Sequence, residues 1–81
     1  MSYRAELHPF ALGQMNGLPF EAVHALAART AELIDAPWDA VPVYPDDPSF
    51  RRTSFGDFGV MAFRVDEDAE LITIYSVVWA G

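Results

Sequence analysis

The residues best suited to chemistry in this sequence are three arginines of its C-terminal half, Arg51, Arg52 and Arg64. Guanidinium groups bind phosphate through paired N–H donors, and fixed positive charge stabilises the negative charge that develops when a phosphodiester is attacked. One interpretation of these arginines is therefore a phosphate clamp. The competing interpretation is that they are exposed strand charges, each paired with a carboxylate such as Asp57 or Asp66.

The positions of these arginines limit which of them can act together. Arg51 and Arg52 are adjacent in a strand-like segment, so their side chains are expected on opposite faces of a sheet. Only one of them can then share the exposed face with Arg64. Phosphodiester cleavage also needs groups that move protons. His8 is a candidate base and Tyr75 a candidate proton donor, against a solvated histidine and a tyrosine packed on the sheet.

The sequence predicts no metal and no cofactor. His8 and His24 fall in no recognisable metal-binding motif, and the chain has no cysteine. No glycine-rich phosphate loop or nucleophile motif is present. The acidic pairs and runs, Asp46-Asp47 and 66–68, have the composition of turns rather than of catalytic carboxylate pairs.

Three strands and two turns are predicted at the C-terminal end of the chain. The segments 50–55, 58–65 and 71–79 are rich in β-branched and aromatic residues. Gly56-Asp57 and the acidic segment 66–70 separate them. This order predicts an antiparallel meander.

The N-terminal half predicts one strand and two helices. Residues 3–8 alternate as a strand, and a short helix over 10–16 is expected to end at Asn16-Gly17. A second helix over 19–35 follows, and Pro37 stops it. The four prolines between residues 37 and 48 predict an irregular connection without a central strand.

The resulting order, β-α-α-β-β-β, predicts a single α+β domain over residues 1–81. A helical hairpin would cover one face of a mostly antiparallel four-stranded sheet. Apolar and small residues recur at helical spacing along the second helix, and this stripe is expected to face the sheet. The stripe is Val23, Ala27, Thr30 and Ile34. The residues expected opposite it are Val60 or Met61, and Ile72 with Ile74.

Charge and composition favour a cytoplasmic protein that works with a partner. The net charge is −7, and all five basic residues are arginine. Such a chain is repelled by phosphate at long range, which disfavours tight non-specific binding to nucleic acid. No apolar run is long enough for a membrane helix, and no signal peptide is expected. The apolar fraction of 52% is high for 81 residues and is compatible with a surface that a partner covers.

Several short segments, in this order, resemble the RelE/ParE toxin superfamily of bacterial toxin–antitoxin modules. They are Leu18-Pro19, Asp35-Ala36-Pro37, Phe50-Arg51-Arg52, Gly56-Asp57-Phe58 and the closing strand over 72–79. The resemblance covers nearly the whole chain in element order, and the ending over 78–81 is similar to small actinobacterial members.

The resemblance implies a cytoplasmic toxin that a cognate antitoxin neutralises by wrapping around its sheet and helices. In the RelE branch the toxin is a metal-independent endonuclease that cuts mRNA in the ribosomal A site, where basic residues stabilise the phosphate while the 2′-hydroxyl attacks. The ribosome and mRNA would then be further partners. In the ParE branch the target is DNA gyrase.

Carried over residue by residue, the RelE pattern matches this chain in part. Arg51 follows the aromatic residue Phe50, as in the RelE branch, but Gly59 stands where that branch has an arginine. Arg64 lies later on the same strand, and no cation follows it. The resemblance thus implies Arg51 and Arg64 as catalytic residues and Arg51 with Arg52 as RNA-binding residues. The alternative is a non-catalytic protein-binding module that keeps the toxin fold and the surface for an antitoxin.

Overall fold

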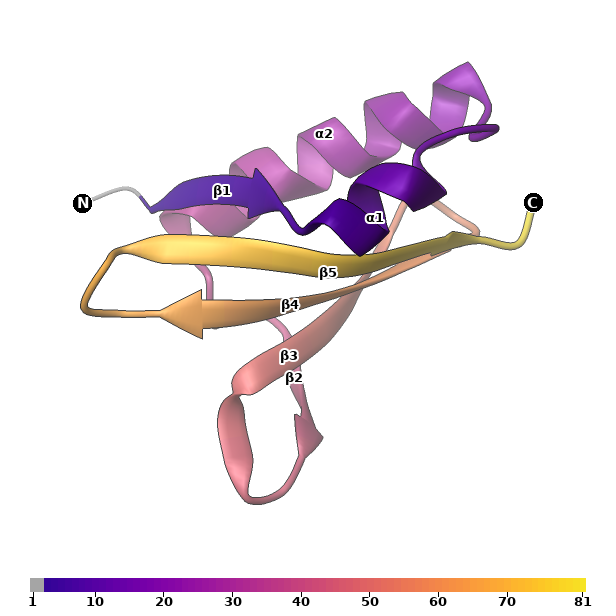
Figure 1. The fold of residues 1–81 in the computed structure, drawn as a ribbon. Helices are drawn as coiled ribbons and strands as arrows, with labels where there is room; N and C mark the ends of the chain where they lie inside the picture. The colour runs from indigo at the N-terminus through magenta and orange to yellow at the C-terminus, as the bar shows by residue number, and fades with distance from the viewer. Residues whose placement is uncertain (1–2) are drawn as a thin grey trace.

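The computed structural model describes residues 3–81, which form a five-stranded sheet with a long helix on one face and a short helix beside one edge (Figure 1). The elements in chain order are β1 (Arg4–Leu7), α1 (Pro9–Gln14), α2 (Phe20–Asp35), β2 (Val41–Tyr44), β3 (Asp47–Phe55), β4 (Gly59–Asp66) and β5 (Leu71–Trp79). No helix among these residues is long and apolar enough to cross a bilayer.

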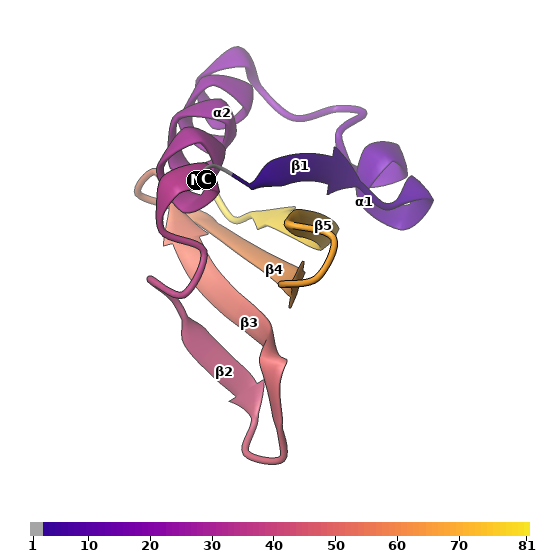
Figure 2. The same cartoon turned by 90° about the vertical axis from the view of Figure 1, so that its left-hand side faces the viewer.

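The sheet has the strand order β1-β5-β4-β3-β2. β1 runs parallel to β5, and the other neighbours are antiparallel. Figure 2 shows α2 along one side of the sheet, whereas the short α1 lies on the other side of the view, beyond the end of β1 and beside β5. The predicted α+β class and the helical pair on a mostly antiparallel sheet are therefore confirmed, with one strand more than predicted.

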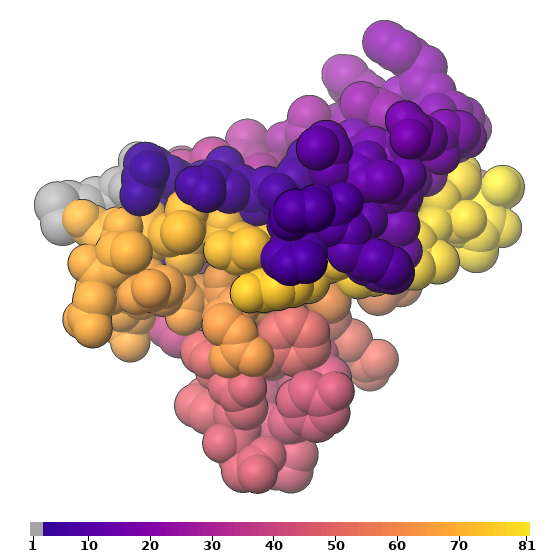
Figure 3. Space-filling model, in the orientation of Figure 1, coloured from indigo at the N-terminus to yellow at the C-terminus, as the bar shows by residue number. Residues whose placement is uncertain are grey.

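The additional strand is β2, which lies in the proline-rich connection that was expected to be irregular. It pairs only with β3, so it forms an edge of the sheet. Proline is tolerated at an edge because its missing N–H can face away from the neighbouring strand. The strand β3 also begins earlier than predicted, at Asp47, and includes Pro48. Together β2 and β3 form a hairpin that projects from the body of the molecule (Figure 3).

The hydrophobic core lies between the helices and the inner face of the sheet. It includes Phe55 from β3, alternating residues of β4, and Ile72, Ile74 and Val77 from β5. Met61 is fully buried, whereas Val60 is 49% exposed on the other face. The sequence prediction for the sheet side of the core is therefore confirmed for Met61, Ile72 and Ile74.

The predicted inner face of α2 was wrong by about one residue. The buried residues of the helix are Ala22, Leu26 and Leu33. The stripe that was expected in the core is rotated toward solvent. Of its members, Val23 and Ala27 are exposed, and Thr30 and Ile34 are half-buried. A helix with two adjacent apolar stripes does not indicate from its own periodicity which stripe faces the sheet.

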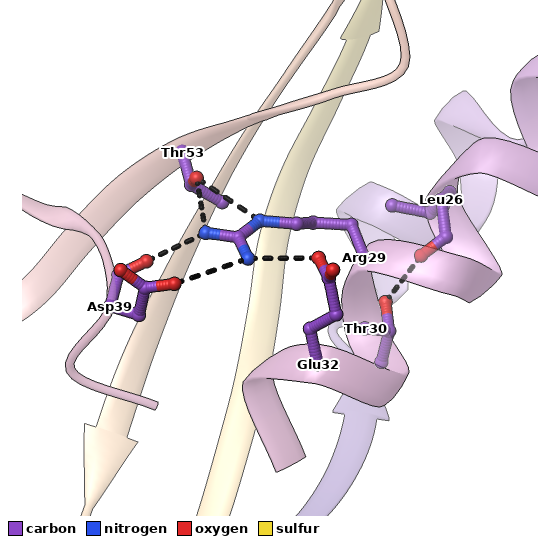
Figure 4. A network of polar contacts seen from close by, with 6 residues as sticks. All are labelled: Leu26, Arg29, Thr30, Glu32, Asp39 and Thr53. Atoms are coloured by element: carbon purple, nitrogen blue, oxygen red, sulfur yellow. Dashed lines mark hydrogen bonds and ion pairs between the residues drawn. The ribbon is translucent and has the colours of Figure 1, made fainter. Parts of the chain in front are cut away.

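Arg29 joins α2 to the sheet (Figure 4). Its Nη2 donates to Thr53 Oγ1 on β3 at 2.8 Å and to the backbone oxygen of Asp39 at 2.6 Å. Its Nη1 forms an ion pair with Glu32 one turn later, at 3.0 Å. This arginine lies between the two layers, and its donors are used for structure.

A β-bulge in β5 alters the alternation of its side chains. Ile74 lies opposite Phe63 and Ser76 opposite Ala62, so Tyr75 is the additional residue. Beyond the bulge, Gln14 of α1 accepts a hydrogen bond from the N–H of Val77 at 2.8 Å. Tyr75 faces away from the core by alternation with the buried Ile74, and the bulge shifts the alternation after it so that Val77, rather than Ser76, is buried.

Candidate functional site

The face of the sheet opposite α2, called here the open face, carries polar and aromatic side chains. Phe50 of β3 lies directly opposite Arg64 of β4 in the ladder. Arg64 alternates with the buried residues Phe63 and Val65, so its side chain lies on the other face. Arg52 of β3 shares the open face because it lies two residues after Phe50.

An aromatic row crosses the open face from one side of the sheet to the other. It consists of Tyr44 of β2, Phe50 of β3, Tyr75 of β5 and His8 after β1. The ring centroids are 5.8 Å apart for Tyr44 and Phe50, 6.1 Å for Phe50 and Tyr75, and 4.7 Å for Tyr75 and His8. At these distances the rings pack on one another, and the row ends in the 53% exposed ring of Tyr44, which is open to a further aromatic group or a base.

His8 has one ring nitrogen engaged and one available. Its Nδ1 accepts a hydrogen bond from the backbone N–H of Phe10 at 3.1 Å, and so His8 is the N-cap of α1. In the neutral ring this contact leaves the proton on Nε2, where it can be donated. His8, the candidate base of the sequence, is therefore held as a proton donor in its neutral form, and it lies beside Tyr75, the candidate proton donor, on the open face.

Arg64 is the cation beside this row. Its guanidinium carbon lies 5.2 Å from the centroid of the Phe50 ring. Its Nη1 donates to Ser49 Oγ at 2.9 Å and contacts Asp47 Oδ2 at 3.1 Å. The hydrogen bond from Ser49, together with Arg64, lowers the pKa of the Asp47 carboxyl from its ordinary value. The acidic partner of Arg64 is therefore Asp47, whose acidity was assigned to a turn, and not Asp57 or Asp66.

Arg51 lies on the other face of the sheet. It is paired with the buried Phe63 of β4, and its guanidinium carbon lies 5.1 Å from the centroid of the Trp38 ring. Its two terminal nitrogens donate to the backbone oxygens of Pro48, at 2.7 Å, and Ala40, at 3.0 Å. The structure does not bring Arg51 and Arg64 together, and Arg52 is the residue that shares the open face with Arg64.

Gly59, which stands where the RelE branch has arginine, is buried at the start of β4. A Cβ atom at this position would lie 2.6 Å from the Phe55 ring and from the Phe55 backbone oxygen. The close approach of Phe55 accounts for the glycine, because no side chain fits there without a shift of β3.

A second surface, called here the groove, lies between α2 and β1. It is an apolar depression of about 430 Å³, lined on one side by the stripe of Val23, Ala27, Thr30 and Ile34. Ala5 and Leu7 of β1 line the other side. The stripe that the sequence analysis assigned to the core therefore lines an open groove.

The outer edge of β1 faces this groove. Arg4 donates to the backbone oxygen of Glu70 and His8 to that of Ile74, so the even-numbered residues bond β5. Tyr3 instead donates to the backbone oxygen of Ile34, on α2, at 2.9 Å. Because peptide groups alternate in direction along a strand, those of Ala5 and Leu7 also face α2 across the groove.

Comparison with solved structures relates this arrangement to one fold. The chain is similar to the RelBE2 toxin–antitoxin complex of Mycobacterium tuberculosis, with a TM-score of 0.86 and 15% identity over 98% of this chain and 99% of that one. It is also similar to the intact Escherichia coli RelBE complex, with a TM-score of 0.82 and 15% identity over 99% of each chain. For the archaeal RelE–RelB complex of Pyrococcus horikoshii the TM-score is 0.72, with 15% identity over 100% of this chain and 98% of that one.

The sequence itself matches no protein-family model and no curated protein. At identities this low, the similarity establishes the fold and not the activity. The chain has the fold of RelE toxins, as the resemblance predicted, with an apolar groove on the helical side and an aromatic row on the open face.

Proposed function

We propose that this chain is the toxin component of a type II toxin–antitoxin module, and that its antitoxin binds in the groove. The observation that carries the proposal is the groove itself, an apolar depression bordered by the edge of β1 in a chain with the RelE fold. The similar Escherichia coli, Mycobacterium tuberculosis and Pyrococcus horikoshii structures are each complexes of a toxin with an antitoxin.

The edge of β1 and the groove favour an extended antitoxin segment. Such a segment would bond the peptide groups of Ala5 and Leu7 and place alternate side chains against Val23 and Ala27 of α2. Apolar residues on the segment would fill the groove. Basic residues beside them are expected, because the net charge of this chain is −7.

For the activity, we propose metal-independent cleavage of ribosome-bound mRNA on the open face. Arg64 would contact the phosphate, and Arg52 lies on the same face to bind the strand. The Nε2–H of His8 and the hydroxyl of Tyr75 are the donors placed to protonate the leaving oxygen, and water would take the proton of the 2′-hydroxyl. Arg51 is not part of this proposal, because its donors bind Pro48 and Ala40.

A second candidate function is a non-catalytic protein-binding module that uses the same groove. The engagement of the arginines favours it: Arg29 and Arg51 bind their own chain, and Arg64 is paired with Asp47. This module would bind an antitoxin and leave mRNA intact. The gyrase-directed alternative has no comparable support in the site.

The groove is tested by two matched substitutions on α2. Ala27 lines the groove, whereas Ala28 is exposed on another face of the same helix. Ala27→Arg should weaken binding of the antitoxin encoded by the neighbouring reading frame by at least about tenfold, since it places a charge in an apolar contact. Ala28→Arg makes the same change of residue and charge and should bind as the wild type does. Calorimetric titration that gave equal affinities for both variants would contradict the proposal.

A further inference from the structure

Arg64 and Ser49 bind the carboxylate of Asp47 in the way that such donors bind a phosphate. One nitrogen, Nη1, meets both oxygens of Asp47, at 3.1 and 3.3 Å, and the hydroxyl of Ser49 at 2.9 Å. Ser49 donates its own proton to Asp47 Oδ1 at 2.8 Å. Arg64 and Ser49 are thus two donors converging on one anion, and the anion is a carboxylate of the same chain.

We propose that Asp47 is an internal competitor for phosphate, which occupies the anion position at Arg64 until the phosphodiester of a single-stranded RNA displaces it. The proposal rests on the proposed action on RNA. It adds that the open face is held in a self-neutralised state by one residue of the projecting hairpin.

Displacement of Asp47 is feasible because the pair is accessible to solvent. The side chains of Arg64 and Asp47 are 43% and 34% exposed. Exposed ion pairs contribute little net free energy, so a competing anion can displace Asp47 at a small cost in free energy. Asp47 is also the first residue of β3, opposite Tyr44 at the end of the hairpin, where few neighbours restrain it.

The neighbours of Arg64 identify the competing anion as part of a nucleic acid strand. The guanidinium lies over Phe50, and Phe50 contacts Tyr44 and Tyr75 in the aromatic row. Phe50 is covered by Arg64 and Tyr44, so the 53% exposed ring of Tyr44 is the one on which a base adjoining a phosphate at Arg64 can stack. Stacking on aromatic side chains is the usual way in which proteins hold unpaired bases.

Two adjacent acids provide a matched pair of variants. Asp47→Asn removes the competing charge and keeps the shape of the side chain. Asp46→Asn removes the same charge one residue away, at an exposed position that makes no ion pair with Arg64. Any general effect of net charge on RNA binding is the same in both. The difference in RNA affinity between the two variants therefore measures the effect of releasing Arg64 from Asp47.

The experiment measures binding of a fluorescently labelled hexauridylate by anisotropy at low salt. Asp47→Asn should bind about two- to fivefold more tightly than Asp46→Asn, the range expected from releasing an exposed ion pair. Adding Arg64→Gln to Asp47→Asn should remove the gain. Equal affinities of the two asparagine variants, or no binding by Asp47→Asn, would overturn the proposal.

Failure of this inference and failure of the proposed toxin function are distinguishable. Oligonucleotide binding is measured on the purified chain and requires neither ribosome nor antitoxin. A chain that arrests growth but shows equal affinities for the two asparagine variants keeps the toxin function and loses the competitor role of Asp47.

Discussion

Arg51 and Trp38 form a stacked pair on the helical side of the sheet, with the guanidinium carbon 5.1 Å from the ring centroid. Trp38 belongs to the connection after α2, and Arg51 to β3. The same guanidinium donates to the backbone oxygens of Pro48 and Ala40. Arg51 therefore connects the projecting hairpin to the segment that leads into it.

Arg51→Ala is expected to destabilise the fold. The substitution removes the stacking on Trp38 and two charged hydrogen bonds, which should lower the free energy of unfolding by about 1–3 kcal/mol. Arg64→Ala, at a more exposed pair, should cost clearly less. Urea denaturation of both variants checks this. Equal destabilisation would contradict the assignment of Arg51 to structure and Arg64 to the open face.

Ile74 is expected to be a principal core residue. It is 2% exposed, whereas Val78 on the same strand is 54% exposed. Ile74→Ala should lower the free energy of unfolding by about 2–5 kcal/mol, a large share of the stability of a small domain. Val78→Ala should change it by less than about 0.5 kcal/mol. An unchanged melting temperature for Ile74→Ala would show that the core is misassigned.

Gln14 is expected to stabilise the bulge of β5 through the N–H of Val77. Gln14→Ala leaves the N–H of Val77 without its acceptor, at a cost of about 1–3 kcal/mol. Gln14→Glu retains an acceptor oxygen at the same reach and should be milder. Amide hydrogen exchange at Val77 should accelerate in Gln14→Ala. Unchanged protection in that variant would indicate that another group satisfies this N–H.

Asp47 should make the free energy of unfolding depend on pH. Its hydrogen bond from Ser49 and its contact with Arg64 lower its pKa in the folded chain below the ordinary value of 3.8. The stabilisation of the fold by the ionised Asp47 carboxylate is therefore fully present above the unfolded-state pKa. It is lost as the pH falls through the folded-state pKa, which lies below 3.8.

Melting temperatures of the wild type and Asp47→Asn, compared as the pH is lowered, measure this contribution directly. The difference between the two should be largest near neutral pH and should vanish in acid. Ser49→Ala removes the main cause of the lowered pKa, so the loss should begin at a higher pH in that variant. A difference that stays constant with pH would contradict the ion pair.

The order of the elements was predictable because turn residues and periodicity mark each one. Gly17, with a φ of 86°, ends the helical segment before α2, where Asn16-Gly17 predicted a stop. The inner face of α2 was not predictable in the same way. Leu26 and Leu33 face the sheet, but Val23 and Ile34 are equally apolar because they line the groove. An apolar groove resembles a core in its composition.

The candidate site was predictable in its residue types but not in its partners. Arg64, His8 and Tyr75 were identified by chemistry, and the structure brings His8 and Tyr75 together. The pairing of Arg64 with Asp47 depends on the hairpin of β2 and β3, and β2 was not predicted. Arg51 was indistinguishable from Arg52 by sequence, since only the register of β3 against β4 decides which of them faces the core.

Growth of the host after induced expression tests whether this chain is a toxin that an antitoxin neutralises. The chain alone should arrest growth, and co-expression of the protein encoded by the neighbouring reading frame should restore it. Arg64→Ala should relieve the arrest without the antitoxin, because it removes the cation proposed to contact phosphate. Normal growth with the wild-type chain alone, at an expression level confirmed by immunoblot, would contradict the claim.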